Sequence, residues 1–538
     1  MPDTIRAADA LAQRLYAAGC RTAVGMPGGE VLTMLDALEA AGIRFILAKH
    51  ENAAGFIAEG VHHRDHAPAI LIGTLGPGTL NGVNVVANAL QDQVPLIVLS
   101  GCVDDAEAQR YTHQVVDQRD VFRPIVKASF TLSAGAAHVI ADKAVSIATE
   151  GLHGPVHIDI PVGVADQPVP AHPPAPRKAA AATAPAGADL EQARGWLKEA
   201  RRPVMIVGAD ALNNHAGDAI TSFAEAHNVP VITTYKAKGI LPEDHAMALG
   251  GAGISALADT VYVPFVQQAD LVICAGYDPV EMRPGWRDIW HPDRDRVIEI
   301  ASAPNHHYMH QASLNFIADC AASLSALGDG IAPRETWTDG ELAKLRADLA
   351  AAFPRNEDWG PAAVVDVCRT VLPRETVATV DSGAHRILLC HTWESFAPRD
   401  LIQSSALCTM GCALPMAIGA KLADPDRPVV SFSGDAGFLM AVGELSTAKE
   451  LGLAPIFVVF VDASLALIEK KQRERQLSNR GVDFEFHDFA AMGQAFGGRG
   501  ATVQSRSELE RALREAMAAD TFTVIAAVIP RGAYDGRI

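Results

Sequence analysis

Two aspartates, Asp435 and Asp462, are the residues of this sequence best placed to bind a metal ion. Each follows a short apolar run, Pro428–Phe432 for the first and Ile456–Val461 for the second, with an amphipathic segment between them. Strand, turn, helix and strand in this order predict two parallel strands, whose carboxyl ends meet at the ligand-binding edge of a sheet. If the strands are neighbours, the carboxylates lie about 5 Å apart and can share one cation. A plainer interpretation makes Asp435 a turn residue and Asp462 the cap of a helix beginning at Ser464. The stretch alone leaves both interpretations open.

The turn around Asp435 is built of small residues, Gly434, Ala436 and Gly437. Free N–H groups and the helix dipole make such a turn at a helix start a site for anions. A carboxylate inside the turn adds a ligand for a hard cation, which can in turn hold phosphate oxygens. The turn therefore predicts a metal-bridged diphosphate site.

The elements that would position these residues form three α/β domains. Short apolar runs alternate with helical segments from the helix predicted at Ile5–Ala18 onward, which predicts doubly wound parallel sheets covered on both faces. We expect domains at 1–166, 189–340 and 357–538, with residues 303–357 largely helical. The proline- and alanine-rich stretch 167–188 is expected to be a semi-rigid linker.

The composition excludes several classes of partner. The 538-residue chain carries a net charge of −18, which argues against nucleic acid and anionic membranes as partners. No apolar run reaches membrane-spanning length, and the N-terminus does not read as a secretory leader. Its eight cysteines are scattered without a CxxC pair, which favours a reducing cytoplasm.

Several further motifs combine glycine-rich turns with residues able to do chemistry. They are Gly25-Met26-Pro27-Gly28-Gly29, Lys49-His50-Glu51, Gly73-Thr74-Leu75-Gly76-Pro77-Gly78 with Asn81, His113-Gln114, Asp381-Ser382-Gly383-Ala384-His385 and Cys408-Thr409-Met410-Gly411-Cys412. Together with Asp435 and Asp462, spaced 27 positions apart, these motifs resemble the thiamin-diphosphate-dependent enzymes of the acetolactate synthase and pyruvate oxidase type. The resemblance covers nearly the whole chain and implies a pyrimidine-binding, a central and a diphosphate-binding domain.

The resemblance implies a role for each motif. Glu51 would be the catalytic residue, a carboxyl group that hydrogen-bonds the aminopyrimidine ring of the cofactor, rather than a surface helix residue. Mg²⁺ would be held by Asp435, Asp462 and the main-chain carbonyl of Ser464. Other cofactor contacts are implied for Pro27, Gly28, Thr74, Asn81, Ser382, Gly383, His385, Cys408, Met410, Gly434, Ala436 and Gly437, and substrate contacts for Gly29, His113, Gln114, Leu467 and Lys471.

The implied chemistry is decarboxylation of a pyruvate-like 2-oxo acid and transfer of the remaining fragment to a second carbonyl compound. A simple 2-oxo acid decarboxylase or a 2-hydroxyacyl-CoA lyase is the alternative within the family, and a non-catalytic nucleotide-binding homologue is a remote one. Glu51 and Asp435 fall in different domains, which in the family meet across subunits, so a homodimer or homotetramer is expected.

The sequence departs from the family pattern at several positions. Asp462 stands where an asparagine is usual, Ala436 and Cys408 replace glycines, and Lys471 occupies a position that is tryptophan in acetolactate synthases. Asp462 is expected to keep the metal site, whereas Lys471 puts a branched-chain biosynthetic role in doubt. The central domain could hold FAD, ADP or nothing.

Overall fold

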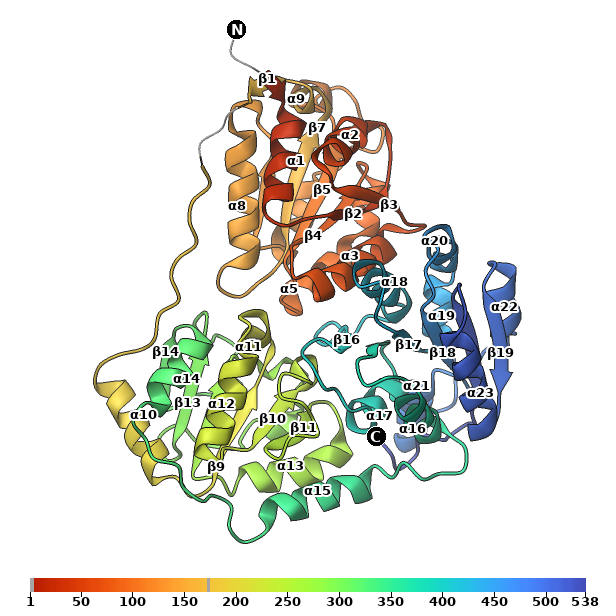
Figure 1. The fold of residues 1–538 in the computed structure, drawn as a ribbon. Coiled ribbons are helices and arrows are strands. Elements are labelled where there is room, and N and C mark those ends of the chain that lie inside the picture. The colour runs from red at the N-terminus through yellow and green to blue at the C-terminus, as the bar shows by residue number, and fades with distance from the viewer. Residues whose placement is uncertain (1–3, 172–174) are drawn as a thin grey trace.

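The part of the chain that the structure describes folds into three domains, each built on a parallel six-stranded sheet covered by helices. The computed structural model describes residues 4–171 and 175–538, so residues 172–174 of the predicted linker lie outside it. The three sheets form three lobes, with the first domain above and the central and third domains side by side below it (Figure 1). The predicted fold class, three doubly wound α/β domains, is confirmed.

The first domain has a parallel sheet in which neighbouring strands are joined by helical crossovers. Its strands in spatial order are β3 (Arg44–Leu47), β2 (Thr22–Met26), β4 (Ala69–Gly73), β5 (Leu96–Cys102), β7 (Val156–Pro161) and β6 (Ala128–Thr131). The main helices are α1 (Ala7–Ala17), α2 (Leu32–Ala41), α3 (Glu51–Asp65), α5 (Val83–Gln91) and α8 (Ala137–Thr149), with short helices α4 (Pro77–Asn81), α6 (Asp105–Ala108), α7 (Gln118–Phe122) and α9 (Val162–Ala165). The order reverses around β2 and β4, so the loops after these strands flank a crevice suited to ligand binding.

The central domain repeats this architecture. Its strands run in the order β11 (Ala248–Ala252), β10 (Val231–Thr234), β9 (Pro203–Val207), β12 (Leu271–Ala275), β13 (Val297–Ala301) and β14 (Leu314–Ile317). Its helices are α10 (Ala188–Glu199), α11 (Ala209–Asn213), α12 (Gly217–His227), α13 (Ala256–Val266) and α14 (Cys320–Gly328), and α15 (Glu341–Ala352) leads toward the third domain.

The third domain carries the two aspartates on neighbouring central strands. Its sheet runs β16 (Leu401–Gln403), β15 (Val377–Val380), β17 (Val429–Gly434), β18 (Ile456–Val461), β20 (Thr523–Val528) and β19 (Arg499–Val503). Its helices are α16 (Pro361–Val371), α17 (Ala384–Thr392), α18 (Ala413–Ala423), α19 (Asp435–Ala441), α20 (Glu444–Glu450), α21 (Ala466–Glu474), α22 (Phe489–Ala495) and α23 (Arg506–Met517). Strands β17 and β18 pair in parallel, with Gly434 opposite Phe460, so the predicted adjacency is confirmed.

Some predicted elements differ in detail. The first helix begins at Ala7 rather than Ile5, because Thr4–Arg6 forms strand β1, which pairs antiparallel with β8 (Pro168–Pro170) inside the predicted linker stretch. The region 303–357 is not largely helical, since long loops flank α14 and α15 and β14 adds an edge strand to the central sheet. This four-residue strand is too short to give a clear periodic signal.

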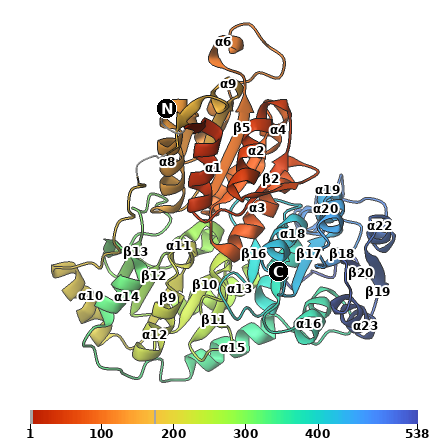
Figure 2. The same cartoon turned by 45° about the horizontal axis from the view of Figure 1, so that its top comes forward.

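Two helices from different domains cross unusually closely and fix the first domain against the third. Helices α3 and α18 lie against each other in both views (Figures 1 and 2) and make the most extensive contact between any two elements described. A side-chain carbon at Gly60 would lie 2.2 Å from the Met416 carbonyl oxygen, and one at Gly419 would lie 1.9 Å from that of Ile57. Glycine at both positions lets the two backbones touch.

Candidate active site

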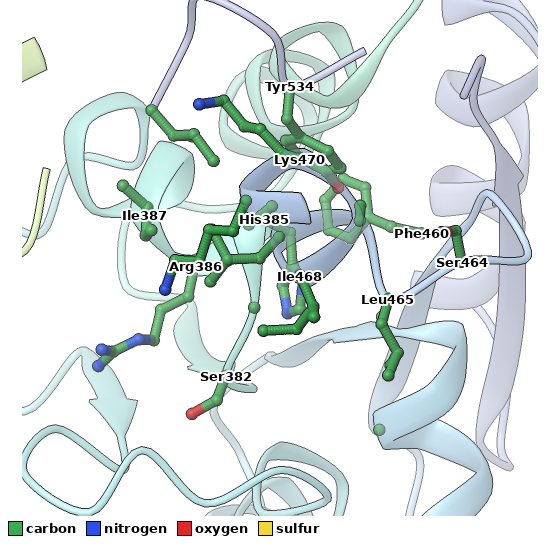
Figure 3. Close-up of a pocket in the computed structure, with 18 of the residues that line it drawn as sticks. Ser382, His385, Arg386, Ile387, Phe460, Ser464, Leu465, Ile468, Lys470 and Tyr534 are labelled. Atoms are coloured by element: carbon green, nitrogen blue, oxygen red, sulfur yellow. The ribbon is translucent and has the colours of Figure 1, made fainter. Parts of the chain in front are cut away.

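A cavity of about 740 Å³ opens at the carboxyl edge of the third sheet, over the ends of β15, β17 and β18. It brings together nearly all the third-domain residues that the motifs predict. These are Ser382, Gly383, His385, Cys408, Met410, Gly434, Asp435, Ala436, Gly437, Asp462, Ser464, Leu467 and Lys471. Figure 3 shows His385 and Ile468 near the centre of this cavity, with Lys470 and Tyr534 on one side of it.

Asp435 and Asp462 are joined through the backbone of the second strand end. One carboxylate oxygen of Asp435 accepts hydrogen bonds from the main-chain N–H groups of Asp462 at 3.1 Å and Ala463 at 2.7 Å. Burial and the nearby Asp435 carboxylate raise the pKa of Asp462 to about 7. Two carboxylates in such a place need a counter-charge, and a divalent cation supplies one. The capping interpretation of Asp462 is wrong, because α21 begins at Ala466 and not at Ser464.

Asp381 ties the loops of the cavity together, although the motif analysis assigned it no role. Its side chain is fully buried and accepts the main-chain N–H of Gly411 at 2.8 Å and that of Ser382 at 2.9 Å. A side-chain carbon at Gly437 would lie 2.0 Å from its second oxygen, so the metal-site turn also packs against this carboxylate. The sequence signal that could have identified Asp381 is its position at the carboxyl end of a predicted strand.

Two polar atoms of the cavity wall have no hydrogen-bond partner among the described residues. They are the Ser382 hydroxyl oxygen and His385 Nε2, both buried. Burial, with a smaller effect from Arg386, lowers the pKa of His385 to about 3, so its ring is neutral at physiological pH. Buried polar groups are almost always paired, so these atoms mark a place where a polar ligand fits.

Cys408 stands at a sharp bend beside a buried ion pair. Its backbone φ is +53°, in the left-handed region where glycine is favoured, which accounts for the glycine usual at this position in the family pattern. Its sulfur lies 3.2 Å from the Arg386 guanidinium, which also pairs with Glu281 at 3.1 Å. Arg386 extends away from the His385 ring (Figure 3). Motif reasoning missed Arg386 and Glu281, which are 105 positions apart in sequence.

The first-domain residues form a second, separate group. Glu51 begins α3 and is buried, so the interpretation as a surface residue is wrong. Asn81 Nδ2 donates to one Glu51 carboxylate oxygen at 2.9 Å, and the other oxygen lies 3.1 Å from where a side-chain carbon on Gly78 would be. Thr74 donates to Glu30, a residue that the motifs did not single out. Gly28 fits against Thr74 only because it lacks a side chain, since an added carbon would lie 2.2 Å from the threonine hydroxyl.

The segment containing His113 and Gln114 lies at the surface beside this group. The main-chain oxygen of Gln114 lies 2.5 Å from where a side-chain carbon on Gly76 would be, so Gln114 packs against the second glycine loop. His113 is exposed and contacts Tyr111 edge to face. Pro27 and Gly29 follow β2 beside the same loop region.

The two groups do not meet within one chain. The cavity is lined by residues of the third domain and by Ile254, Ala256 and Arg283 of the central domain, and none of its lining residues comes from the first domain. The cavity residues that sequence reasoning missed include Ile254, Ala256, Arg386, Phe460, Lys470, Glu474 and Tyr534.

The edge of the central sheet is acidic. Asp210 and Asp278 lie just after the ends of β9 and β12, Glu299 lies in the middle of β13, and Asp210 already accepts the main-chain N–H of Ser302 at 2.8 Å. Like charges at this edge disfavour the diphosphate of FAD or ADP. These acidic side chains supply no diphosphate site, and neither FAD nor ADP enters the function proposed below.

The paired carboxylates, the unpartnered polar atoms and the glutamate–asparagine pair together have the arrangement of a thiamin-diphosphate-dependent enzyme. Three family models match the chain in order: "Thiamine pyrophosphate enzyme, N-terminal TPP binding domain" over 5–121, "central domain" over 190–327 and "C-terminal TPP binding domain" over 381–527. The chain belongs to the thiamine pyrophosphate enzyme family, in its acetolactate synthase and pyruvate oxidase-like branch.

Relatives in this branch match most of the chain. Acetolactate synthase isozyme 1 large subunit of Escherichia coli is 32% identical, covering 84% of this chain and 81% of the relative. Acetolactate synthase of Bacillus subtilis is 29% identical over 97% of this chain and 92% of its own. A probable 2-ketoarginine decarboxylase of Pseudomonas aeruginosa is 30% identical over 97% and 94%. Within residues 4–171 and 175–538, no helix is both long and apolar enough to cross a membrane.

Proposed function

We propose that this protein is an acetolactate synthase-like carboligase that uses thiamin diphosphate and Mg²⁺. It decarboxylates a 2-oxo acid and joins the remaining fragment to a second carbonyl compound. The observation that carries this proposal is the cavity in which Asp435 and Asp462 lie beside the unpartnered Ser382 and His385 atoms. Carboxylates suit the metal ion, and the free Ser382 hydroxyl and the helix start at the small-residue turn suit the diphosphate.

The metal ligands would be Asp435, Asp462 and the main-chain oxygen of Ser464. In the described ranges there is no cluster of three His, Cys, Asp or Glu side chains, so a cation here takes main-chain and phosphate oxygens as further ligands. Asp435 is held in place by the N–H groups of Asp462 and Ala463, so the carboxylate keeps its orientation without the ion.

When bound, the cofactor supplies the capacity to stabilise the carbanion left by decarboxylation. Glu51 holds a proton for the cofactor's pyrimidine ring nitrogen. Asn81 donates to one Glu51 oxygen and so leaves the other, which faces Gly78, free to take part in proton exchange. Cys408 contributes its main-chain carbonyl to the cofactor site, and Met410 contributes the bulk of its side chain. On the first-domain side, the cofactor site is shaped by Pro27, Gly28 and Thr74. The substrate space is lined by Gly29 and Gln114. His113 is exposed to solvent.

The active form is proposed to be a homodimer or a homotetramer, in which the first domain of one copy covers the cavity of another. Leu32 and Leu80 of the first domain and Met440 of the third are large apolar residues that lie exposed beside the two half-sites. Apolar side chains exposed at the rim of a half-formed site suit burial against a second copy. We also propose a cytoplasmic location, because the cysteines are scattered and unpaired in the described residues, as is usual in a reducing compartment.

The function is tested with purified protein, thiamin diphosphate, Mg²⁺ and a panel of 2-oxo acids, with carbon dioxide and products followed by mass spectrometry. A product with a new carbon–carbon bond supports the carboligase. An aldehyde as the only product supports a simple decarboxylase, the activity named for the probable 2-ketoarginine decarboxylase relative. Acyl-CoA substrates test the 2-hydroxyacyl-CoA lyase. We expect Glu51→Gln to lower turnover about 10²- to 10⁴-fold while cofactor binding, measured by calorimetry, persists.

The assembly is tested by complementation. Glu51→Gln and Asp435→Ala variants are each expected to be inactive. Refolded or co-expressed together, they should regain activity, because each mixed dimer contains one site with both residues intact. No recovery, with mixed dimers demonstrated by mass spectrometry, would refute a site shared between subunits.

A further inference from the structure

Helix α21 forms one wall of the cavity and brings two lysines to it. Helix α21 supplies Leu467, Lys470, Lys471 and Glu474 to this wall. Their spacing of three and four residues puts them on one face of the helix. Glu469 and Arg473 point elsewhere, because Arg473 pairs with Asp535 at 2.7 Å and with Glu469.

The two lysines differ in their partners. Lys470 forms an ion pair with Glu474 one turn later, so its charge is balanced within the helix. Lys471 is exposed, and its side-chain ammonium group makes no ion pair or hydrogen bond with any residue in the described part of the chain. Of these two neighbouring cations, only Lys471 is free to bind a ligand.

The other positive charges of the cavity are already balanced or shared. Arg386 is buried against Glu281 at 3.1 Å. Arg283, from the central domain, lies 3.5 Å from Asp259 but keeps 42% of its side chain exposed, so it can still contact an anion. Ile254, Ile387 and Ile468 make much of the remaining wall apolar, so an unbalanced cation here lacks protein partners.

A 2-oxo acid has one carboxylate, which needs only one of the two available cations, Arg283 and Lys471. Arg283 can hold the single carboxylate of such a substrate, in the bidentate geometry that guanidinium groups favour. Lys471 then lines the cavity without an anion from the protein or from this carboxylate to pair with. Its counterpart would be a second negative group, and an ammonium ion recognises carboxylate, sulfonate and phosphonate alike as a point charge.

We propose that the natural substrate carries a second anionic group, a carboxylate, sulfonate or phosphonate on its side chain, and that Lys471 is the residue that selects it. This inference rests on the proposed function and adds the substrate class to it. Lys471 is here a specificity-determining residue, and Lys470 beside it is the matched control because its charge is held by Glu474.

The test compares substrates of equal carbon number, with and without a terminal anionic group. The holoenzyme with thiamin diphosphate and Mg²⁺ is given 2-oxopentanoate or 2-oxoglutarate, and then pyruvate, 3-sulfopyruvate or 3-phosphonopyruvate, and kcat/KM is measured for each. We expect the enzyme to prefer a dianionic member by about 10- to 100-fold. Which of the three acids is preferred identifies the group.

The variants locate the selectivity. Lys471→Met should reduce the preference toward unity, Lys471→Glu should reverse it, and Lys470→Met should leave the ratio as in the wild type. Cofactor affinity is measured in parallel by calorimetry. A loss of cofactor affinity in Lys471→Met without a change in the substrate ratio would overturn the inference, because Lys471 would then bind the cofactor.

Other outcomes separate this inference from the proposed function. Preference for uncharged side chains in the wild type, or an equal loss for both members of a pair in Lys471→Met, overturns the inference and leaves the function standing. Failure to consume any 2-oxo acid overturns both.

Discussion

The Glu444 carboxylate of the third domain accepts the main-chain N–H of Lys49 in the first domain at 2.8 Å. The same oxygen accepts the N–H of His50 at 3.1 Å, and Thr447 donates to the other oxygen at 2.7 Å. Glu51 follows directly, as the first residue of α3. A buried acid of one domain thus fixes the backbone that presents the predicted catalytic glutamate of another.

Removing this acceptor should cost both stability and activity. Glu444→Ala leaves two N–H groups and a hydroxyl without their partner in a buried place, which we expect to destabilise the protein by about 1–3 kcal/mol. Turnover should also fall, since the start of α3 is less firmly held. Glu444→Gln keeps an amide oxygen for the N–H groups and serves as the control, with a smaller effect. Urea unfolding and kcat/KM measure the two losses, and an alanine variant equal to the wild type in both would contradict this role.

The crossing of α3 and α18 should not tolerate a methyl group. A side-chain carbon at Gly419 would lie 1.9 Å from the Ile57 carbonyl oxygen and 2.9 Å from the Val61 nitrogen, so Gly419→Ala must push the helices apart. We expect a loss of at least about 1–3 kcal/mol, as for overpacked cores. Gly195→Ala in α10 is the control: nothing lies within 4 Å of its added carbon, so it should stabilise by up to about 1 kcal/mol. Equal unfolding midpoints for the two variants would contradict the close contact.

Sequence patterns predicted the parts of the site that lie in short local motifs. The positions of Asp435 and Asp462 followed from two apolar runs and the rule that parallel strands end at one edge, and the structure pairs these strands as expected. The loops containing Ser382 and Cys408 were found by motif, and both line the cavity. The roles of these residues remain predictions.

Contacts between distant segments could not be predicted in this way. Glu444 lies 395 positions from Lys49, and Glu281 lies 105 positions from Arg386, so no local period connects either pair. Lys236 is another case, because it is buried between Asp92 at 3.0 Å and the Gln403 carbonyl at 2.9 Å, and so joins all three domains. From sequence alone, a lysine or arginine is expected at the surface. Only the packing of the domains shows that Lys236 and Arg386 are paired and buried.

Stability should fall in mild acid, in part through His391. Burial, with a smaller effect from Lys238, lowers the pKa of His391 to about 3, while the Tyr235 hydroxyl lies 2.7 Å from its Nε2. The unfolded chain binds a proton at this residue below pH 6.5, whereas the folded chain does not. Its contribution is therefore complete above pH 6.5 and is lost as the pH falls toward 3, with a slope of about 1.4 kcal/mol per pH unit.

A His391→Gln variant removes this titration and keeps a polar partner for Tyr235. Between pH 7.5 and 5.5, we expect the unfolding free energy of the wild type to fall more steeply than that of the variant, as measured by urea denaturation. Parallel pH profiles would show that His391 is protonated as readily in the folded protein as in the unfolded one.

Asp462 in place of the asparagine usual in the family pattern should strengthen cation binding. With a cation bound, Asp462 and Asp435 give the site two negative charges, and the raised pKa of Asp462 reflects its burial first and the repulsion from Asp435 second. Asp462→Asn keeps an oxygen ligand but loses one charge, so we expect the affinity for Mn²⁺, read by electron paramagnetic resonance in the absence of diphosphate, to fall about tenfold. Asp435→Ala should abolish binding, because it removes the carboxylate that the backbone of Asp462 and Ala463 orients. Asp535→Asn, whose carboxylate is engaged by Arg473, is the control and should bind Mn²⁺ like the wild type. Equal or tighter binding by Asp462→Asn would mean that the extra charge adds repulsion without contributing to the ion.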